Sequence, residues 1–338
     1  MNEDRPKIRS AIVGYGGEFN MGKHHAGEME AVGIELAAVC DIDPKRAAEA
    51  ARDFPHIRTF TNVEELLSQP DIDLVTLITP HNTHADLAMR TLEHGKHCIL
   101  EKPMCIHAED ADKLARKARE SGLMLSVYHN RRWNDWYLTV QDLIRRELLG
   151  DIFFAEFYFG GYERPRTWWR SDKAVSGGAF YDWGAHYMDW VLGLIPSAVK
   201  SARGYSQKLL WQDVSNEDHL DGIIQFENGA VVHAQTSAIS RAGTVQKRIL
   251  GTKGAVTIQN KEKFLTLYTE VGGVPVETKV PFLPGKPLAY YANIADHLAN
   301  KADLIVTPEQ ARRVISVLES VTKSAELGRE IPVPYENI

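Results

Sequence analysis

The chain has 338 residues, of which 44% are hydrophobic, so it has enough apolar side chains for two cores. A net charge of -6 and an isoelectric point near 6.1 argue against a nucleic-acid surface, which needs a concentrated basic face. No apolar run approaches the roughly 20 residues of a membrane span, and the first residues lack the apolar segment of a signal peptide. We therefore expect a two-domain cytoplasmic protein that binds neither nucleic acid nor membrane.

The first predicted element is a buried strand over 10–13 that runs into a glycine-rich turn. Gly14, Gly16 and Gly17 follow the strand, and Gly22 comes later than the G-x-G-x-x-G spacing requires, which indicates an insertion. Glycines at such a turn let the backbone approach a pyrophosphate, which the amides at the start of the next helix hold. The segment is typical of a dinucleotide-binding unit.

A second apolar strand, over 34–40, ends at Asp41. A carboxylate at this place accepts hydrogen bonds from the ribose diol of NAD and repels the 2′-phosphate of NADP. Arg46 lies close enough in sequence to soften that repulsion. NAD is therefore the expected cofactor, and NADP is the less favoured alternative.

Apolar strands and amphipathic helices then alternate along the chain. We expect helices over 44–52, 63–67, 86–93 and 108–120, and strands over 57–60, 74–78, 97–100 and 123–127. Thr61 and Glu64 have the spacing of a capping box at the second of these helices. The alternation predicts a Rossmann domain over 1–127, a doubly wound parallel sheet whose ligand crevice lies at the strand ends that carry Gly14, Asp41, Thr79 and Glu101.

From residue 128 the pattern changes to strands joined by short turns. We expect strands over 152–159, 220–226, 231–236, 247–250, 256–258 and 264–268, and helices over 180–192, 290–299 and 308–327, the last capped by Thr307. The turns at 227–229 and 272–273 favour antiparallel connections. Residues 128–338 are thus predicted to form an α+β domain with a large, mainly antiparallel open sheet for substrate binding and oligomerisation.

Four motifs follow one another in order: the glycine turn, Thr79-Pro80-His81-Asn82-Thr83-His84, Glu101-Lys102-Pro103, and the segment from Gly177 to His186. Together they resemble the Gfo/Idh/MocA family, which includes glucose-fructose oxidoreductase and inositol dehydrogenase. The resemblance covers nearly the whole chain. It implies an NAD(P)-dependent sugar or polyol dehydrogenase that acts on small carbohydrates and assembles as a homodimer or homotetramer.

The resemblance also implies that Lys102, Asp182 and His186 face the nicotinamide and a carbohydrate hydroxyl. Asp182, His186 and Asp189 share one face of the predicted helix by their spacing of i, i+4 and i+7. An imidazole suits removal of the hydroxyl proton, and the Lys102 ammonium suits stabilisation of the resulting charge on oxygen. The alternative is a polar stripe on a buried helix whose members only satisfy one another.

The loop after the strand over 74–78 is where the family's cofactor contacts lie, so Thr79, Pro80, Asn82 and His84 are expected to contact the cofactor. By the same resemblance, Arg132 is expected near the cofactor and His129 near the substrate. His81 and His84 have a spacing that could suit a metal, but they lie in the loop where the family's cofactor contacts are. The three cysteines form no metal-binding pair, so no metal is expected.

The segment from Tyr162 to Arg170 is a candidate substrate loop, with Tyr162, Arg166, Trp168 and Trp169 as the residues that would contact a sugar. Indole rings pack on the apolar faces of sugar rings, and guanidinium groups bind oxyanions. Packing at a domain or subunit interface is the alternative for these aromatic residues.

Two further functions stay open beside the dehydrogenase. One is a glycoside hydrolase that oxidises a sugar carbon transiently with bound NAD, eliminates the aglycone, adds water and reduces the ketone again. That mechanism needs an additional acid or base, for which His129, Tyr162 and Tyr181 are candidates. The other is a cofactor-binding regulator that has the fold without turnover.

Overall fold

The computed structural model describes residues 8–17, 21–259 and 261–336; residues 18–20, within the expected insertion of the glycine turn, lie outside them. Contacts between residues divide the chain into two compact units. Unit 1 comprises Met1–Cys105, Glu109–Tyr128 and Leu288–Ala311, and unit 2 comprises Ile106–Ala108, His129–Pro287 and Arg312–Ile338. Unit 1 therefore contains a segment that lies far along the chain from the rest of it.

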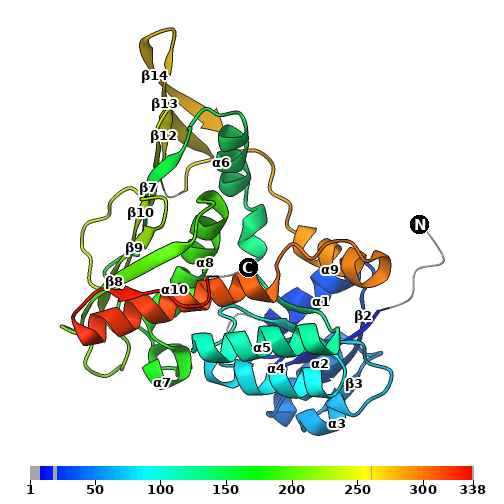
Figure 1. Cartoon of the computed structure of the whole chain (residues 1–338). Coiled ribbons are helices and arrows are strands. Elements are labelled where there is room, and N and C mark those ends of the chain that lie inside the picture. The colour runs from blue at the N-terminus through cyan, green and yellow to red at the C-terminus, as the bar shows by residue number, and fades with distance from the viewer. Residues whose placement is uncertain (1–7, 18–20, 260, 337–338) are drawn as a thin grey trace. The chain divides into compact units, whose positions relative to one another are not determined.

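Unit 1 is built around a six-stranded parallel sheet with the order β3-β2-β1-β4-β5-β6. The strands are β1 (Arg9–Val13), β2 (Glu35–Cys40), β3 (Arg58–Phe60), β4 (Leu74–Leu77), β5 (His97–Leu100) and β6 (Leu125–Val127). The central residues of β1, β2, β4, β5 and β6 are buried because helices surround the sheet, as Figure 1 shows, whereas β3 lies at the sheet edge and its central residue is exposed. This arrangement confirms the predicted Rossmann fold.

The helices around this sheet are α1 (Met21–Ala31), α2 (Pro44–Asp53), α3 (Val63–Leu67), α4 (His84–Glu93), α5 (Ala108–Ser121) and α9 (Ala289–Asn300). The capping box predicted at Thr61 is wrong. Helix α3 begins after Asn62, whose side-chain oxygen accepts a hydrogen bond from the amide of Glu64 at 2.9 Å. The asparagine oxygen satisfies a helix-terminal amide that the threonine would otherwise have capped.

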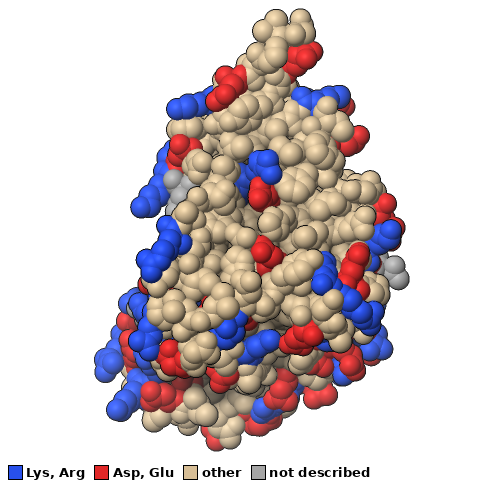
Figure 2. All heavy atoms as spheres, turned by 90° about the vertical axis from the view of Figure 1, so that its left-hand side faces the viewer, with Lys and Arg blue, Asp and Glu red and all other residues tan. Residues whose placement is uncertain are grey.

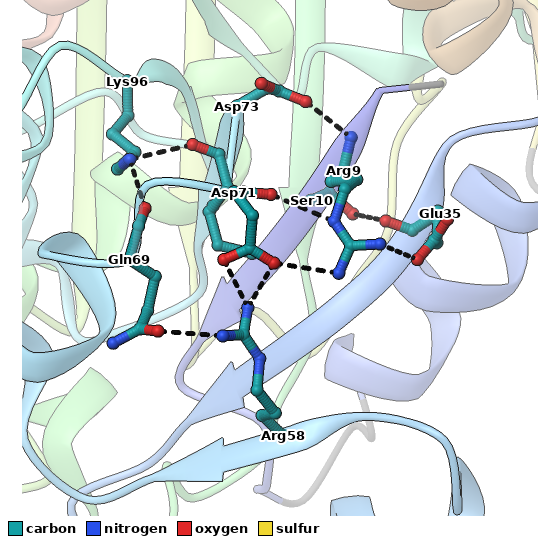
Figure 3. A network of polar contacts seen from close by, with 9 residues as sticks. Arg9, Ser10, Glu35, Arg58, Gln69, Asp71, Asp73 and Lys96 are labelled. Atoms are coloured by element: carbon teal, nitrogen blue, oxygen red, sulfur yellow. Dashed lines mark hydrogen bonds and ion pairs between the residues drawn. The ribbon is translucent and has the colours of Figure 1, made fainter. Parts of the chain in front are cut away.

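A network of ion pairs and hydrogen bonds ties the amino-terminal ends of these strands together (Figure 3). Arg9 contacts Glu35 at 2.5 Å and Asp71 at 3.0 Å, and Arg58 contacts the same Asp71 carboxylate at 2.8 Å. Lys96 is 6% exposed and donates to the carbonyl oxygens of Gln69 at 2.7 Å and Ile72 at 2.9 Å. The network lies at the sheet edge opposite to the carboxyl ends of the strands, so it stabilises the scaffold on the far side from the predicted ligand edge.

Unit 2 contains a nine-stranded sheet with the order β14-β13-β12-β11-β7-β10-β9-β8-β15. The strands are β7 (Ile152–Gly160), β8 (Val199–Gln207), β9 (His219–Phe226), β10 (Val231–Ser237), β11 (Lys247–Gly251), β12 (Gly254–Ile258), β13 (Phe264–Val271), β14 (Val274–Pro281) and β15 (Ile331–Pro332). Its neighbouring strands are antiparallel except β10 and β7, which pair in parallel. The predicted mainly antiparallel sheet is confirmed, and it also contains β8, β14 and β15, which the sequence pattern did not predict.

One face of this sheet packs against α8 (Ala179–Leu194) and α10 (Pro308–Leu327), which lie on the same side of it in Figure 1. A Cβ atom at Gly204 would lie 2.0 Å from the carbonyl oxygen of Val321, so only glycine allows β8 to approach α10 this closely. Thr307 caps α10 as predicted, because its hydroxyl accepts the amide of Gln310 at 3.2 Å.

The remaining elements of the described residues are α6 (Asp135–Arg145), α7 (Lys173–Ser176) and three short 3₁₀ segments, η1 (His81–Thr83), η2 (Asn130–Trp133) and η3 (Trp169–Ser171). Within the part of the chain that the structure describes, none of the helices combines the length and the apolar character needed to span a bilayer.

Candidate functional site

The glycine turn after β1 requires glycine at two places for steric reasons. Gly14 has φ +88°, and a Cβ atom there would lie 2.4 Å from the carbonyl oxygen of Ile78. A Cβ atom at Gly22 would lie 2.4 Å from the carbonyl oxygen of Tyr15. The turn thus brings the backbone of β1, the loop after β4 and the start of α1 into close contact, as a phosphate-binding turn needs.

Asp41, at the end of β2, holds this turn directly. Its carboxylate accepts hydrogen bonds from the backbone amides of Tyr15 at 2.9 Å, Gly16 at 3.3 Å and Asp43 at 2.9 Å. The side chain of Arg46 lies against Gly16, where it occupies the space that a Cβ atom would need. Asp41 therefore joins the glycine turn to the start of α2, next to a guanidinium group.

The loop after β4 is tied to the Glu-Lys-Pro turn by His84. Its imidazole is fully buried, and its nitrogens lie 2.9 Å from the carbonyl oxygen of Thr79 and 2.8 Å from that of Pro103. Burial lowers the pKa of His84, although both carbonyl contacts act in the opposite direction. Asn82, by contrast, lies exposed on η1. His84 thus bridges two loops that were each predicted to contact the cofactor.

Lys102 follows β5 on a turn that Glu101 fixes. One carboxylate oxygen of Glu101 accepts the Lys102 amide at 2.9 Å, and the other lies 3.0 Å from Nε2 of His25. Nδ1 of His25 lies 2.6 Å from the hydroxyl of Tyr291 on α9. Burial would raise the pKa of Glu101, but the bond to His25 and the neighbouring positive charges lower it to about 2. The sequence pattern gave no reason to connect His25 or Tyr291 with Lys102.

Helix α8 begins at a glycine pair because a buried carboxylate occupies its amino terminus. Gly177 and Gly178 have φ +85° and +120°, and a Cβ atom at Gly178 would lie 2.9 Å from a carboxylate oxygen of Glu217. Glu217 accepts the amide of Phe180 at 3.0 Å. A carboxylate at this end of a helix stabilises its dipole and its unpaired amides. Glu217 therefore fixes the helix that carries Asp182 and His186.

Asp182, His186 and Asp189 of α8 each contact an arginine side chain. Nη1 of Arg170 lies 3.2 Å from a carboxylate oxygen of Asp182, which is partly exposed. Arg131 donates from Nε to Nε2 of His186 at 3.2 Å, and His186 is 4% exposed. The buried carboxylate of Asp189 accepts hydrogen bonds from two nitrogens of Arg132, the shorter at 2.6 Å.

Of the two neighbouring arginines, Arg131 rather than Arg132 contacts the imidazole. Arg132 instead forms a two-nitrogen ion pair with Asp189, and His129 lies 3.9 Å from the same carboxylate and is almost fully buried. Because a guanidinium group only donates, its bond to Nε2 places the imidazole proton of His186 on Nδ1. Nε2 of His186 is therefore unprotonated, but its one lone pair accepts the Arg131 bond, so Arg131 has to release this nitrogen before the imidazole can act as a general base.

Aromatic rings surround this imidazole. The rings of His186 and Trp190 are stacked at 6.0 Å, and Trp183 lies edge-on at 5.6 Å. The guanidinium of Arg131 lies 4.9 Å from the centre of the Trp183 ring. Lys247, which the sequence analysis did not single out, also contacts this cluster, with Nζ 5.7 Å from the centre of the Trp190 ring.

The predicted substrate loop is anchored at several points. Trp168 and Trp169 both pack on the guanidinium of Arg170, at 5.4 and 5.0 Å. The ring of Tyr162 lies 3.6 Å from the guanidinium of Arg241, and the carbonyl oxygen of Arg166 accepts the hydroxyl of Ser171. The loop is thus connected to α8, because the guanidinium of Arg170 bonds to the carboxylate of Asp182.

The described residues offer no group of three or more histidine, cysteine, aspartate or glutamate side chains that could hold a metal ion. The cysteines Cys40, Cys98 and Cys105 are buried thiols.

Comparison with protein families gives two matches in chain order. Residues 8–129 match an oxidoreductase family described as an NAD-binding Rossmann fold, and residues 137–257 match the GFO/IDH/MocA C-terminal domain. Both matches agree with the two sheets described above.

The chain is also similar to individual proteins over three quarters of its length or more. It is 31% identical to the scyllo-inositol 2-dehydrogenase (NADP(+)) IolW of Bacillus subtilis, over 97% of this chain and 96% of that protein. A scyllo-inositol 2-dehydrogenase (NAD(+)) of the same organism is 27% identical over 75% of this chain and 74% of its own length. The solved structure of an NAD-binding protein from Listeria innocua superposes with a TM-score of 0.85 at 26% identity, over 98% of each chain. The chain belongs to the Gfo/Idh/MocA family of oxidoreductases.

Proposed function

We propose that this protein is a dehydrogenase that transfers hydride between a secondary hydroxyl of a sugar, polyol or glycoside and a nicotinamide cofactor. The observation that carries the proposal is the bond from Arg131 to Nε2 of His186, because it fixes the proton of a buried imidazole on Nδ1 and leaves Nε2 as the nitrogen that can take a proton once this bond is released. The relatives named as scyllo-inositol dehydrogenases support a polyhydroxylated ring as the substrate.

In this proposal each active-site residue has its own role in the reaction. NAD supplies the hydride acceptor when it is bound. Arg131 releases Nε2 of His186, which then takes the hydroxyl proton, and the Lys102 ammonium stabilises the negative charge that develops on the oxygen. Asp182, held by Arg170, orients the sugar through its partly exposed carboxylate. His129, Tyr162, Arg166, Trp168 and Trp169 remain the proposed substrate contacts.

The glycine turn, Asp41 and the loop after β4 are the proposed cofactor contacts. We propose NAD as the preferred cofactor, because the ionised Asp41 carboxylate would lie beside the additional phosphate of NADP. Arg46, which packs on Gly16, is a cation beside this turn that would favour NADP. Titration of the protein with both cofactors tests this: NAD should bind more tightly, and Arg46→Ala should widen the difference.

We also propose that the protein is a homodimer or homotetramer that associates through the open face of the nine-stranded sheet. Tyr205, Ile223 and Tyr268 point to this face and are 50%, 40% and 39% exposed. Figure 2 shows the molecule from this side, where large areas carry no lysine, arginine, aspartate or glutamate. Light scattering should give at least twice the monomer mass, and Ile223→Lys should lower it.

The experiment that tests the function is a panel of sugars, polyols, sugar acids and aryl glycosides, in which NADH and released aglycone are followed together. The proposal expects NADH formation from at least one alcohol in the panel and no aglycone release. Aglycone release without net NADH would instead indicate the redox-neutral hydrolase. Tight cofactor binding without either product across the panel would indicate a regulator and contradict the proposal.

A further inference from the structure

A hollow of about 410 Å³ lies at the amino-terminal edge of the parallel sheet, and all the residues that line it belong to unit 1. Its wall consists of the starts of β5 and β6, the ends of α5 and α9, and the loop that leads into α10. The glycine turn, Asp41 and Lys102 follow the carboxyl ends of β1, β2 and β5, which is the opposite edge of the same sheet. The hollow is therefore separate from the proposed cofactor contacts.

The wall of the hollow carries more positive than negative charge. Its described residues include two full cations, two histidines and one carboxylate, namely Arg119, Lys301, His97, His297 and Glu309. Most of the others are apolar. The positive excess is local, since the chain as a whole has a net charge of -6. A concave surface of this size that combines apolar side chains with a few polar groups is typical of a small-molecule site.

The two full cations have no counter-charge within the part of the chain that the structure describes. Neither the guanidinium of Arg119 nor the ammonium of Lys301 forms a hydrogen bond or an ion pair there, and the Glu309 carboxylate forms none with them. Arg116, nearly one turn earlier on α5, instead pairs with Asp112 at 3.1 Å. Arg119 and Lys301 are both exposed, so a ligand from solution can reach them.

Lys301 has a backbone conformation that lysine rarely adopts. It caps the carboxyl end of α9 with φ +55° and ψ +32°, the left-handed region in which glycine is the favoured residue. Helices α4 and α5 of the same unit are followed by Gly95 and Gly122 in this region. Of the described residues of unit 1, Lys301 is the one other than glycine with a positive φ. A lysine in this place costs stability relative to glycine, which a role for its charge would explain.

The imidazole of His97 offers a hydrogen-bond donor to the hollow. Its Nδ1 accepts the amide of Met124 at 2.9 Å, so the proton of the neutral ring is on Nε2. Burial lowers the pKa of His97; the Asp73 carboxylate opposes this effect, and the charge of His297 adds to it. Nε2 has no partner among the described residues and is not sealed from solvent. The neutral ring can therefore donate to a ligand.

His297 offers a second donor when it is protonated. Its Nδ1 donates to the carbonyl oxygen of Ala302 at 2.6 Å, which leaves Nε2 as the nitrogen that can take a further proton. This Nε2 also lacks a partner among the described residues without being sealed from solvent. A bound anion would favour the protonated ring.

We propose that this hollow binds a small organic anion, a carboxylate or a phosphate ester, through Arg119, Lys301 and Nε2 of His97. These groups would form charge-assisted hydrogen bonds with the oxyanion. A metal ion does not suit the hollow, because the two cations would repel it and the described residues offer no group of three ligands. The inference goes beyond the proposed dehydrogenase, since the ligand would be neither its substrate nor its cofactor.

Calorimetry with a carboxylate and a phosphate ester tests the proposal. Citrate and D-fructose 1,6-bisphosphate are titrated into the NAD-saturated protein, and D-fructose is the neutral comparison. We expect one molecule of at least one anion to bind per chain with a Kd below about 1 mM, and no binding of D-fructose. Arg119→Ala and Lys301→Gly should each weaken this binding at least about tenfold. Arg116→Ala is the matched control on the same helix and should change it by less than about twofold.

Lys301→Gly separates loss of binding from loss of the fold. Because glycine suits the left-handed conformation, the Tm of this variant without ligand should equal or exceed that of the wild type. The proposal is wrong if neither anion binds, or if Arg119→Ala and Lys301→Gly bind it as tightly as Arg116→Ala does. Repeating the titration without NAD should give the same Kd. An anion that binds only without NAD would occupy the glycine turn instead and would also contradict the proposal.

Discussion

His25 lies between Glu101 and Tyr291, with Nε2 3.0 Å from the carboxylate and Nδ1 2.6 Å from the phenol oxygen. A carboxylate only accepts hydrogen bonds, so Nε2 carries a proton and donates it to Glu101. The other oxygen of Glu101 accepts the Lys102 amide at 2.9 Å. The orientation of Lys102 therefore depends on a buried helix residue and on a tyrosine that lies far along the chain.

Tyr291→Phe tests this dependence with the loss of one hydroxyl. We expect kcat to fall by about tenfold with unchanged NAD affinity, because small displacements of a positioned group are costly in catalysis. Hydrogen exchange at the Lys102 amide should become faster as well.

Tyr290→Phe is the matched control for that variant. Tyr290 is the neighbouring residue of α9, is 1% exposed and bonds to Ser126 at 3.0 Å instead of to His25. Both variants remove one buried hydroxyl from adjacent residues of α9, so they should lose similar thermal stability. Equal kcat and equal exchange at Lys102 in the two variants would show that Tyr291 has only a structural role.

Lys102→Ala and His186→Ala test the catalytic assignments. Each should reduce turnover by at least about a hundredfold and leave NAD affinity nearly unchanged, as expected for groups that act on the transition state. His94→Ala is a suitable control, because this histidine lies on the exposed end of α4 and contacts Glu64 there. Wild-type rates in both test variants would remove Lys102 and His186 from the active site.

Lys247→Met should stabilise the protein at pH 7. The folded pKa of Lys247 is about 8, below its ordinary value of 10.5, so the folded state binds fewer protons between these values than the unfolded state. The amine therefore destabilises the fold below pH 8, and this effect disappears as the pH rises towards 10.5. Thermal unfolding should show a higher Tm for the variant at pH 7, with a difference that shrinks from pH 8 to pH 10. A variant less stable than the wild type at pH 7 would contradict the desolvation of Lys247.

Lys96→Met should have the opposite effect on stability without changing the chemistry. Lys96 donates to two carbonyl oxygens at the far edge of the parallel sheet (Figure 3), and methionine would leave both without this donor. We expect the free energy of unfolding to fall by about 1–3 kcal/mol, the cost of leaving buried acceptors unsatisfied. Urea denaturation measures this, with the exposed Lys113→Met as the control. A change below the error of the measurement would contradict a stabilising role for Lys96.

The sequence was most informative where a single local pattern is sufficient to predict an element or a face of a helix. The alternation of apolar strands and helices predicts the parallel sheet, and the spacing of Asp182, His186 and Asp189 predicts one polar face on α8. Strand β8 was missed because its residues 199–207 are mostly polar or small. Helix α6 was also missed.

The supporting contacts depend on long-range packing that periodicity does not reveal. A lysine at the start of a strand normally reaches water, so Lys247 gave no signal until the Trp136 and Trp190 rings were placed around it. In the same way, the pattern of α9 indicates a helix but not that Tyr291 would meet His25. Motifs in this chain predict the groups that react, and the fold is needed to find the groups that hold them.

The most direct test of the central claim follows the hydride itself. A substrate from the panel, deuterated at the carbinol carbon, is incubated with NAD and the protein, and the reduced cofactor is analysed by mass spectrometry. The account predicts deuterium in the nicotinamide with the wild type, and at least about a hundredfold less of it at equal times with His186→Ala. Reduced cofactor without deuterium, or an undiminished yield from the variant, would contradict it.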